Sequence, residues 1–151
     1  MRPIMNNSTP HLRINERLTD YWRGLCRGRP MPLESDVVME DLKDLWDYCF
    51  LLSVKANGFA YDYLGPSLIL AYGDDLTGKE ITETLLYPHP PSLINTFKNV
   101  VLNAAPARDE NEFTNSLGEK VKYRSCVLPL ASAGDTKKVT FLLGGMKWKA
   151  F

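Results

Sequence analysis

The stretch that decides the fold covers residues 48–64 and reads YCFLLSVKANGFAYDYL. Residues 48–54 and 59–64 are rich in branched and aromatic side chains, a composition typical of β-strands. The tripeptide Ala56-Asn57-Gly58 separates them, and Asn-Gly favours the two-residue turns of antiparallel hairpins. The stretch therefore predicts a β-hairpin.

The turn also predicts which residues of the two strands face one another. If the loop consists of the two residues after Ala56, Val54 lies opposite Tyr61 and Leu52 lies opposite Tyr63. Side chains two positions apart in a strand share a face. These four residues are therefore expected to form one apolar and aromatic face.

A helix is predicted before the hairpin, because apolar side chains recur there at three- and four-residue spacing after Pro10. Charged residues occupy the other side of this helix. The apolar stripe consists of Ile14, Leu18, Tyr21, Trp22 and Leu25. A stripe of this kind needs a surface to cover, which is either the outer face of the sheet or a second copy of the chain.

A second N-terminal helix is expected from Ser35 or Asp36, with Val38, Leu42, Leu45 and Trp46 on one stripe. Behind the hairpin, short helical turns cover residues 66–78 and a longer helix covers residues 92–105. The last third of the chain reads as three more strands, at residues 112–117, 120–130 and 137–148.

This order of elements predicts an α+β fold with a five-stranded antiparallel sheet. The short helices and the one longer helix cover one face of the sheet, and N-terminal helices are added to it. We expect a flexible N-terminus at residues 1–9, a helical extension at 10–47 for dimerisation or for capping the sheet, and a core domain at 48–151. At 151 residues, with 44% hydrophobic composition, the chain suits one globular domain.

Composition also limits the function classes. The formal net charge is zero, so the molecule offers no strong field to nucleic acid or to an anionic membrane. No apolar run reaches the length of a membrane span. The three cysteines are widely spaced and lack a CxxC pattern, which favours a reducing, cytoplasmic location.

Several motifs in this order resemble the PAS domain family. They are Phe59-Ala60-Tyr61-Asp62-Tyr63-Leu64-Gly65, followed by Tyr72-Gly73-Asp74-Asp75-Leu76-Thr77-Gly78-Lys79. The pairs Tyr21-Trp22 and Gly28-Arg29, a later Pro32, the strand Phe50-Leu51-Leu52-Ser53-Val54 and the run Leu128-Pro129-Leu130 resemble most the short stand-alone PAS proteins of alphaproteobacteria. The resemblance implies a bacterial sensory or protein-interaction module for signal transduction. Such modules are without catalysis, frequently dimeric, and have a cleft between the inner sheet face and the helices.

If that cleft is open, side chains from the hairpin, the helices and the fourth strand line a site for a small apolar ligand. The predicted lining residues are Leu52, Tyr61, Tyr63, Leu68, Phe97, Val101, Tyr123 and Val127. The same residues could instead fill a closed core, which would make the protein a pure interaction module. Both alternatives stay open at this point.

Cofactor chemistry is not indicated. Haem ligation would have to use His89, but this histidine lies between two prolines and is expected to face solvent. Flavin photochemistry of the light-oxygen-voltage type needs a cysteine on the short helices, and residues 66–105 contain none. With His11 and His89 as the only histidines, a hydrolytic triad is not expected and the protein is predicted not to be an enzyme.

The expected partners are a second copy of the chain and a signalling protein that the sequence does not identify. Because no transmitter segment follows Phe151 in this sequence, output is expected to pass to that protein in trans.

Overall fold

The computed structural model describes residues 14–82 and 88–151, and within them six strands form one antiparallel sheet. The spatial order of the strands is β3-β2-β1-β6-β5-β4. The strands are β1 (Cys49–Lys55), β2 (Gly58–Leu64), β3 (Glu80–Thr82), β4 (Ala107–Thr114), β5 (Lys120–Leu130) and β6 (Phe141–Ala150). The α-helices are α1 (Ile14–Cys26), α2 (Pro66–Tyr72) and α3 (Pro91–Asn103).

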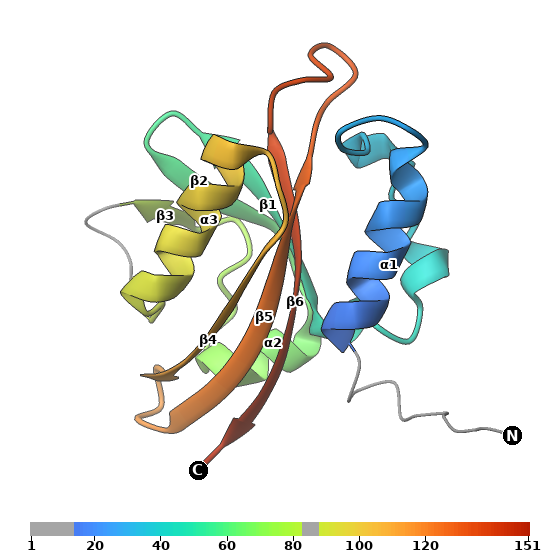
Figure 1. Ribbon diagram of the computed structural model, residues 1–151. Coiled ribbons are helices and arrows are strands. Elements are labelled where there is room, and N and C mark those ends of the chain that lie inside the picture. Colours follow the sequence, from blue (N-terminus) through green and yellow to red (C-terminus); the bar gives the residue numbers. More distant parts are fainter. Residues whose placement is uncertain (1–13, 83–87) are drawn as a thin grey trace, which may run out of the picture.

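The helices cover both faces of the sheet. Figure 1 shows α3 on one side of the strands and α1 on the other. The helix α2 lies on the side of α3, because the ring of its Tyr72 contacts those of Tyr61 and Phe113. We call the side of α2 and α3 the inner face and the side of α1 the outer face. The α+β class is thus as predicted, but the sheet has six strands where five were expected.

The additional strand is β3, which pairs with the edge of the hairpin. Its three residues were too few to stand out as a strand in the sequence. Gly58 of β2 lies so close to β3 that an added Cβ would stand 1.9 Å from the carbonyl oxygen of Ile81. Glycine at this position therefore serves the close approach of two strands rather than the turn.

The hairpin loop lies one residue earlier than predicted. Lys55 pairs with Gly58, so the loop consists of the two residues between them, and Val54 pairs with Phe59 instead of Tyr61. The predicted register is therefore wrong by two residues. A shift of two keeps every side chain on its face, since side chains alternate with period two.

The second N-terminal helix was also predicted wrongly. The segment forms three short 3₁₀ turns instead, η3 (Glu34–Asp36), η4 (Met39–Leu42) and η5 (Trp46–Tyr48). Side-chain oxygens accept from backbone amides at its start: the Asp36 carboxylate accepts from Leu33 N at 2.9 Å, and the Tyr21 hydroxyl of α1 accepts from Val38 N at 2.9 Å. These contacts compete with the regular hydrogen bonds of an α-helix.

The apolar stripe of α1 packs onto strands β5 and β6 of its own chain. Ile14, Leu18 and Trp22 are buried, and the Trp22 indole donates to the carbonyl of Pro129 on β5 at 2.8 Å. Of the two surfaces left open by the sequence, the helix therefore covers the outer face of the sheet. The Arg29 side chain ends α1 by donating to the carbonyls of Leu25 and Cys26.

Adjacent glycines in β6 allow close packing on both faces of the sheet. A Cβ on Gly144 would lie 2.0 Å from the Phe50 ring on the inner face, whereas one on Gly145 would lie 3.1 Å from Leu18 of α1. The pairing of β6 is continuous through both residues, so the pair forms neither a bulge nor a phosphate-binding loop. The two missing side chains make room for the core on one side and for α1 on the other.

Candidate functional site

The inner face of the sheet, where the ligand pocket was predicted, is filled by side chains. Six of the eight predicted lining residues are at most 1% exposed, namely Leu52, Tyr61, Leu68, Phe97, Tyr123 and Val127. Phe97 of α3 lies with its ring centre 5.7 Å from that of Phe50 and 5.5 Å from that of Phe59. Ring contacts at these distances are those of a packed aromatic core.

Tyr63 does not share the inner face with Tyr61, so this part of the prediction is wrong. The β1–β2 register shifts between Leu51 and Leu52, so Asp62 is not paired with any residue of β1. This extra residue turns the Tyr63 side chain to the outer face of the sheet. There the ring stacks on Trp46 of η5 at 4.5 Å, and its hydroxyl donates to the Trp46 carbonyl at 2.9 Å. Because of the bulge, Tyr63 packs against η5 and holds this turn on the outer face of the sheet.

His89 is buried, contrary to the expectation that it faces solvent. Its ring stacks on Tyr61 and lies 4.9 Å from the ring of Tyr72, and its Nε2 stands 2.9 Å from the Tyr61 hydroxyl. Burial raises the pKa of both tyrosines well above the ordinary value of 10.0. Ligation of haem through this nitrogen would require breaking the Tyr61 contact.

Tyr123 uses its hydroxyl within the fold. It donates to the Asp109 carboxylate, which also accepts from Ser92 at 3.2 Å. Burial and the hydrogen bond to Asp109 raise the pKa of Tyr123. Since Ser92 lies in α3, Asp109 in β4 and Tyr123 in β5, this cluster fixes the start of α3 to the sheet. Tyr61, Tyr72 and Tyr123 are called the buried tyrosines below.

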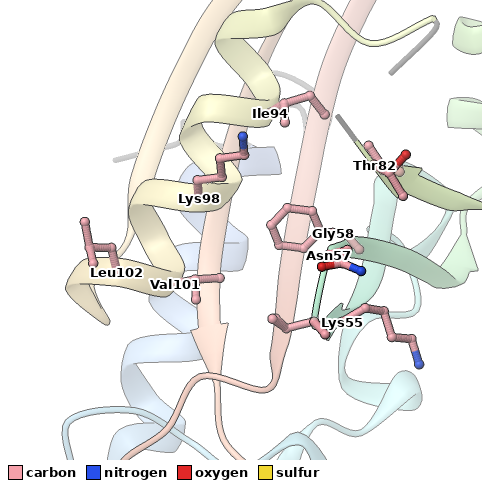
Figure 2. A pocket seen from close by; sticks show the side chains of 12 residues that line it. Lys55, Asn57, Gly58, Thr82, Ile94, Lys98, Val101 and Leu102 are labelled. Atoms are coloured by element: carbon pink, nitrogen blue, oxygen red, sulfur yellow. The ribbon is translucent and has the colours of Figure 1, made fainter. Parts of the chain in front are cut away.

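A cavity of about 860 Å³ lies instead between α3 and the tip of the β1–β2 hairpin (Figure 2). We call it the α3–hairpin cleft. Of the eight predicted lining residues it contains Val101. Its lining consists of Val54, Lys55, Ala56, Asn57, Gly58, Phe59, Ile81, Thr82, Ile94, Lys98, Val101 and Leu102.

The cleft has an apolar floor and a basic rim. Phe59, Ile81 and Ile94 are 3–4% exposed and close its floor, whereas Leu102 at the rim is 81% exposed. In Figure 2 Lys98 extends from α3 along the cleft toward Ile94. The sequence predicted both walls as elements, the helix at residues 92–105 and the hairpin, but the space between them depends on how far α3 stands from the hairpin.

Residues 11–146 match the family profile described as PAS domain, which is most of the chain and includes α1. The chain belongs to the PAS domain family. The predicted resemblance to PAS domains is thereby confirmed, whereas the resemblance to alphaproteobacterial stand-alone members stays a prediction.

Solved structures share the PAS fold at low sequence identity. The PAS domain of the fruit-fly ELK potassium channel has a TM-score of 0.55 at 14% identity, covering 76% of this chain and 95% of that one. A light-oxygen-voltage domain studied with a flavin analogue has a TM-score of 0.56 at 10% identity, covering 74% and 82%. The light-state dimer of the fungal blue-light photoreceptor Vivid has a TM-score of 0.51 at 12% identity, covering 66% and 75%. No curated protein matches significantly.

Two of the cysteines, Cys49 and Cys126, lie on the outer face of the sheet. Cys49 and Cys126 both pair with Gly145, whose Cα faces α1, so these thiols lie beneath α1 and away from α2 and α3. Burial raises the pKa of both thiols, that of Cys126 to about 11. These two cysteines are free thiols that pack as small buried side chains.

The predicted interface residues of the PAS protein belong in part to its own core. Ile14 and Leu18 are at most 1% exposed and Trp22 is 6% exposed, whereas Tyr21 and Leu25 are half-buried. While α1 lies on the sheet of its own chain, most of the stripe is therefore not accessible to a second copy of the chain. The homodimer itself stays a prediction.

In residues 14–82 and 88–151 no cluster of three or more histidine, cysteine, aspartate or glutamate side chains is arranged to hold a metal ion. None of the helices described is both long and apolar enough to span a bilayer.

Proposed function

We propose that this PAS protein is a non-catalytic, cytoplasmic regulatory module that binds a small apolar molecule in the α3–hairpin cleft and signals in trans. The cleft carries the proposal. Its volume of about 860 Å³ lies within the roughly 300–1,000 Å³ common for small-molecule sites, and its floor is apolar. The interior predicted for the ligand is already filled by side chains.

A ligand in this cleft would contact elements that lie far apart in the sequence. Ile94, Lys98 and Val101 come from α3, Val54 and Phe59 from the hairpin. Filling the space between them favours one spacing of α3 relative to the hairpin, which is a population shift of the kind that ligands produce in regulatory domains. A partner, including a second copy of the chain, would bind more tightly to one of these spacings at the surface.

The alternative is a pure protein-interaction module without a ligand. The closed core supports it, because six of the eight predicted pocket residues have no exposed surface to offer. In that case the cleft would hold a side chain of a partner protein.

Native mass spectrometry of freshly purified protein, with an ultraviolet-visible spectrum, tests for a resident molecule. In parallel, an NMR titration with n-octanol tests the cleft. We expect extra mass that is lost on denaturation, or octanol-induced shifts confined to amides around Phe59, Ile94 and Val101.

The variant Leu102→Trp, which places a bulky ring at the rim, should abolish octanol binding. Leu117→Trp is the matched control, because Leu117 is a similarly exposed leucine, 72% exposed, on the turn between β4 and β5. No extra mass together with no shifts at the cleft would refute the ligand and favour the interaction module.

A further inference from the structure

We propose that strand β4 pairs edge to edge with the β4 strand of a second copy of the chain, so that two sheets become one. The pairing is antiparallel about a twofold axis at Glu110. This inference does not rest on the proposed function, because no residue of β4 lines the α3–hairpin cleft. It gives the predicted homodimer a surface other than the stripe of α1, which packs on its own sheet.

Of the two edges of the sheet, the one formed by β4 is long and regular. β3 ends the sheet on one side with three residues, whereas β4 ends it on the other side with eight. Pairing of β4 with β5 is continuous from Ala107 to Thr114, and no proline falls within these residues. Short length, bulges and prolines are common means of blocking an edge strand. Within residues 14–82 and 88–151, no strand pairs with the open side of β4.

Every second residue of β4 offers its backbone amide and carbonyl to this open side. The Asp109 carbonyl points toward β5, since it accepts from the Ser125 hydroxyl at 3.4 Å. The Glu112 amide points away from β5, since it donates to the side-chain carbonyl of Asn111 at 2.8 Å. These directions alternate along a strand of an antiparallel sheet. The even-numbered residues in 108–112 therefore carry the backbone groups that a second strand would bind.

The charges of β4 on the outer face are complementary to their own reverse order. With Glu110 on the axis, Arg108 of each copy lies opposite the partner's Glu112, which gives two pairs of opposite charge. Arg108 is exposed and makes no ion pair with the residues that the structure describes. Glu112 lies opposite Lys122 in its own sheet, so in the dimer it stands between two cations.

The two Glu110 side chains meet at the axis, where each already has a cation beside it. In its own sheet Glu110 lies opposite Arg124, and its carboxylate stands 3.4 Å from the Arg124 guanidinium. This neighbour reduces the repulsion between the two carboxylates. The axis therefore carries two ion pairs instead of two isolated negative charges.

The same register also suits the inner face. There Ala107 lies opposite the partner's Phe113, and Asp109 lies opposite the partner's Asn111. Phe113 is 7% exposed and Ala107 is half-buried, so the first pair is apolar. The second pair sets a side-chain amide beside a carboxylate, which are a donor and an acceptor of hydrogen bonds.

Neighbouring registers fit less well. Placing Arg108 opposite the partner's Glu110 would bring Asp109 opposite its own copy and shorten the overlap to residues 107–111. The opposite shift would set Glu110 against the partner's Glu112 twice. Like charges directly opposite one another destabilise a strand pair. The register about Glu110 thus combines the longer overlap, residues 107–113, with the two pairs of opposite charge.

Two charge reversals test this register. Arg108→Glu sets like charge against the partner's Glu112, and Glu112→Arg sets like charge against the partner's Arg108. Each variant alone should raise the dimer dissociation constant about tenfold, because two exposed pairs turn from attraction to repulsion. An equimolar mixture of the two variants should recover the original dissociation constant as a heterodimer, since every glutamate at these positions then meets an arginine.

Sedimentation equilibrium of the full chain at low ionic strength gives the dissociation constants. Lys138→Glu is the control, because it reverses an exposed cation in the connection between β5 and β6, outside β4. It should leave the dissociation constant unchanged. Added salt should weaken the dimer, because salt screens exposed charge pairs.

Amide hydrogen exchange locates the interface independently. It is measured at protein concentrations above and below the dissociation constant. Dimerisation through β4 should slow exchange at the amides of Arg108 and Glu110, which face the open edge in a single copy. The amides of α1 should exchange equally at both concentrations.

Three outcomes overturn the proposal. One is a chain that is monomeric at every concentration, which would leave the β4 edge to an extended segment of another protein. Another is a mixture of Arg108→Glu and Glu112→Arg that dimerises no better than either variant alone. The third is a dimer that protects amides in α1 instead of β4. Octanol binding in the α3–hairpin cleft is measured separately, so none of these results decides the proposed function.

Discussion

Truncation of Trp22 measures whether α1 is part of the folded domain or a separable helix. The Trp22 side chain is 6% exposed beneath α1, and its indole donates to the Pro129 carbonyl at 2.8 Å. Trp22→Ala removes the hydrogen bond and the packing of this side chain against β5 and leaves a cavity. Losses of this kind cost about 3–5 kcal/mol of the free energy of unfolding.

Trp22→Phe separates packing from hydrogen bonding. It keeps an aromatic ring but leaves the Pro129 carbonyl without its indole donor, which costs about 1–3 kcal/mol when the acceptor is buried. Tyr21→Phe is the neighbouring control, because the Tyr21 hydroxyl bonds Val38 N and Asp41 in an exposed region. Its cost should be smaller than that of Trp22→Phe.

Urea unfolding followed by far-ultraviolet circular dichroism gives the free energies, at two protein concentrations tenfold apart. Thiol labelling of Cys126, which lies beneath α1, gives an independent rate of α1 opening. We expect faster labelling in Trp22→Ala. A Trp22→Ala variant within about 0.5 kcal/mol of the unaltered protein would refute intramolecular docking. A loss that grows on dilution would instead indicate that α1 acts between copies of the chain.

Three further predictions test the sheet and the titrating groups. Gly144→Ala should lower the free energy of unfolding by about 1–3 kcal/mol, since its methyl group meets the Phe50 ring. Adding Phe50→Leu to the same chain should restore part of the loss, and equal losses with and without Phe50→Leu contradict this. The Leu33 amide and the Arg29 guanidinium lower the pKa of Asp36 below 3.8, so its contribution to stability is present above that pH and lost as the pH falls further. Acid titration of unfolding in Asp36→Asn should lack this contribution, and an unchanged acid dependence would contradict it. The raised pKa values of the buried tyrosines make their contribution present below pH 10 and lost as the pH rises beyond it. Their ionisation, followed by absorbance at alkaline pH, should therefore coincide with loss of circular dichroism, and ionisation in the folded state would contradict the burial.

Local sequence signals predicted most of the elements, because each signal acts within a few residues. The hairpin, α1 and the helix at residues 92–105 all follow from turn chemistry and periodicity, and the structure has each of them. The second N-terminal helix failed for the opposite reason. Its apolar spacing suits a helix, but the Tyr21 hydroxyl of α1 binds the Val38 amide from outside the segment, and the Asp36 carboxylate binds the Leu33 amide just before it.

The candidate site was predicted in part. Val101 is in both the predicted lining and the cleft. Tyr63 lies on the outer face instead of the inner face, because one residue of β2 is not paired with β1. A bulge of a single residue reverses the faces of everything that follows it, and nothing in the composition of residues 58–64 marks its position. His89 was misplaced because proline neighbours describe a loop, and burial of that loop depends on Tyr61 and Tyr72 from other elements.

By itself, the sequence determined the strands and main helices, the amphipathic face of α1 and the resemblance to PAS domains. These depend on periodicity, turn residues and the order of motifs along the chain. Only the tertiary structure decided that α1 covers its own sheet, that the inner face is closed and that a cleft opens between α3 and the hairpin. Each of these depends on the distance between elements far apart in the chain, and that distance is set by packing at sites such as Gly144 against Phe50 and Trp22 against Pro129.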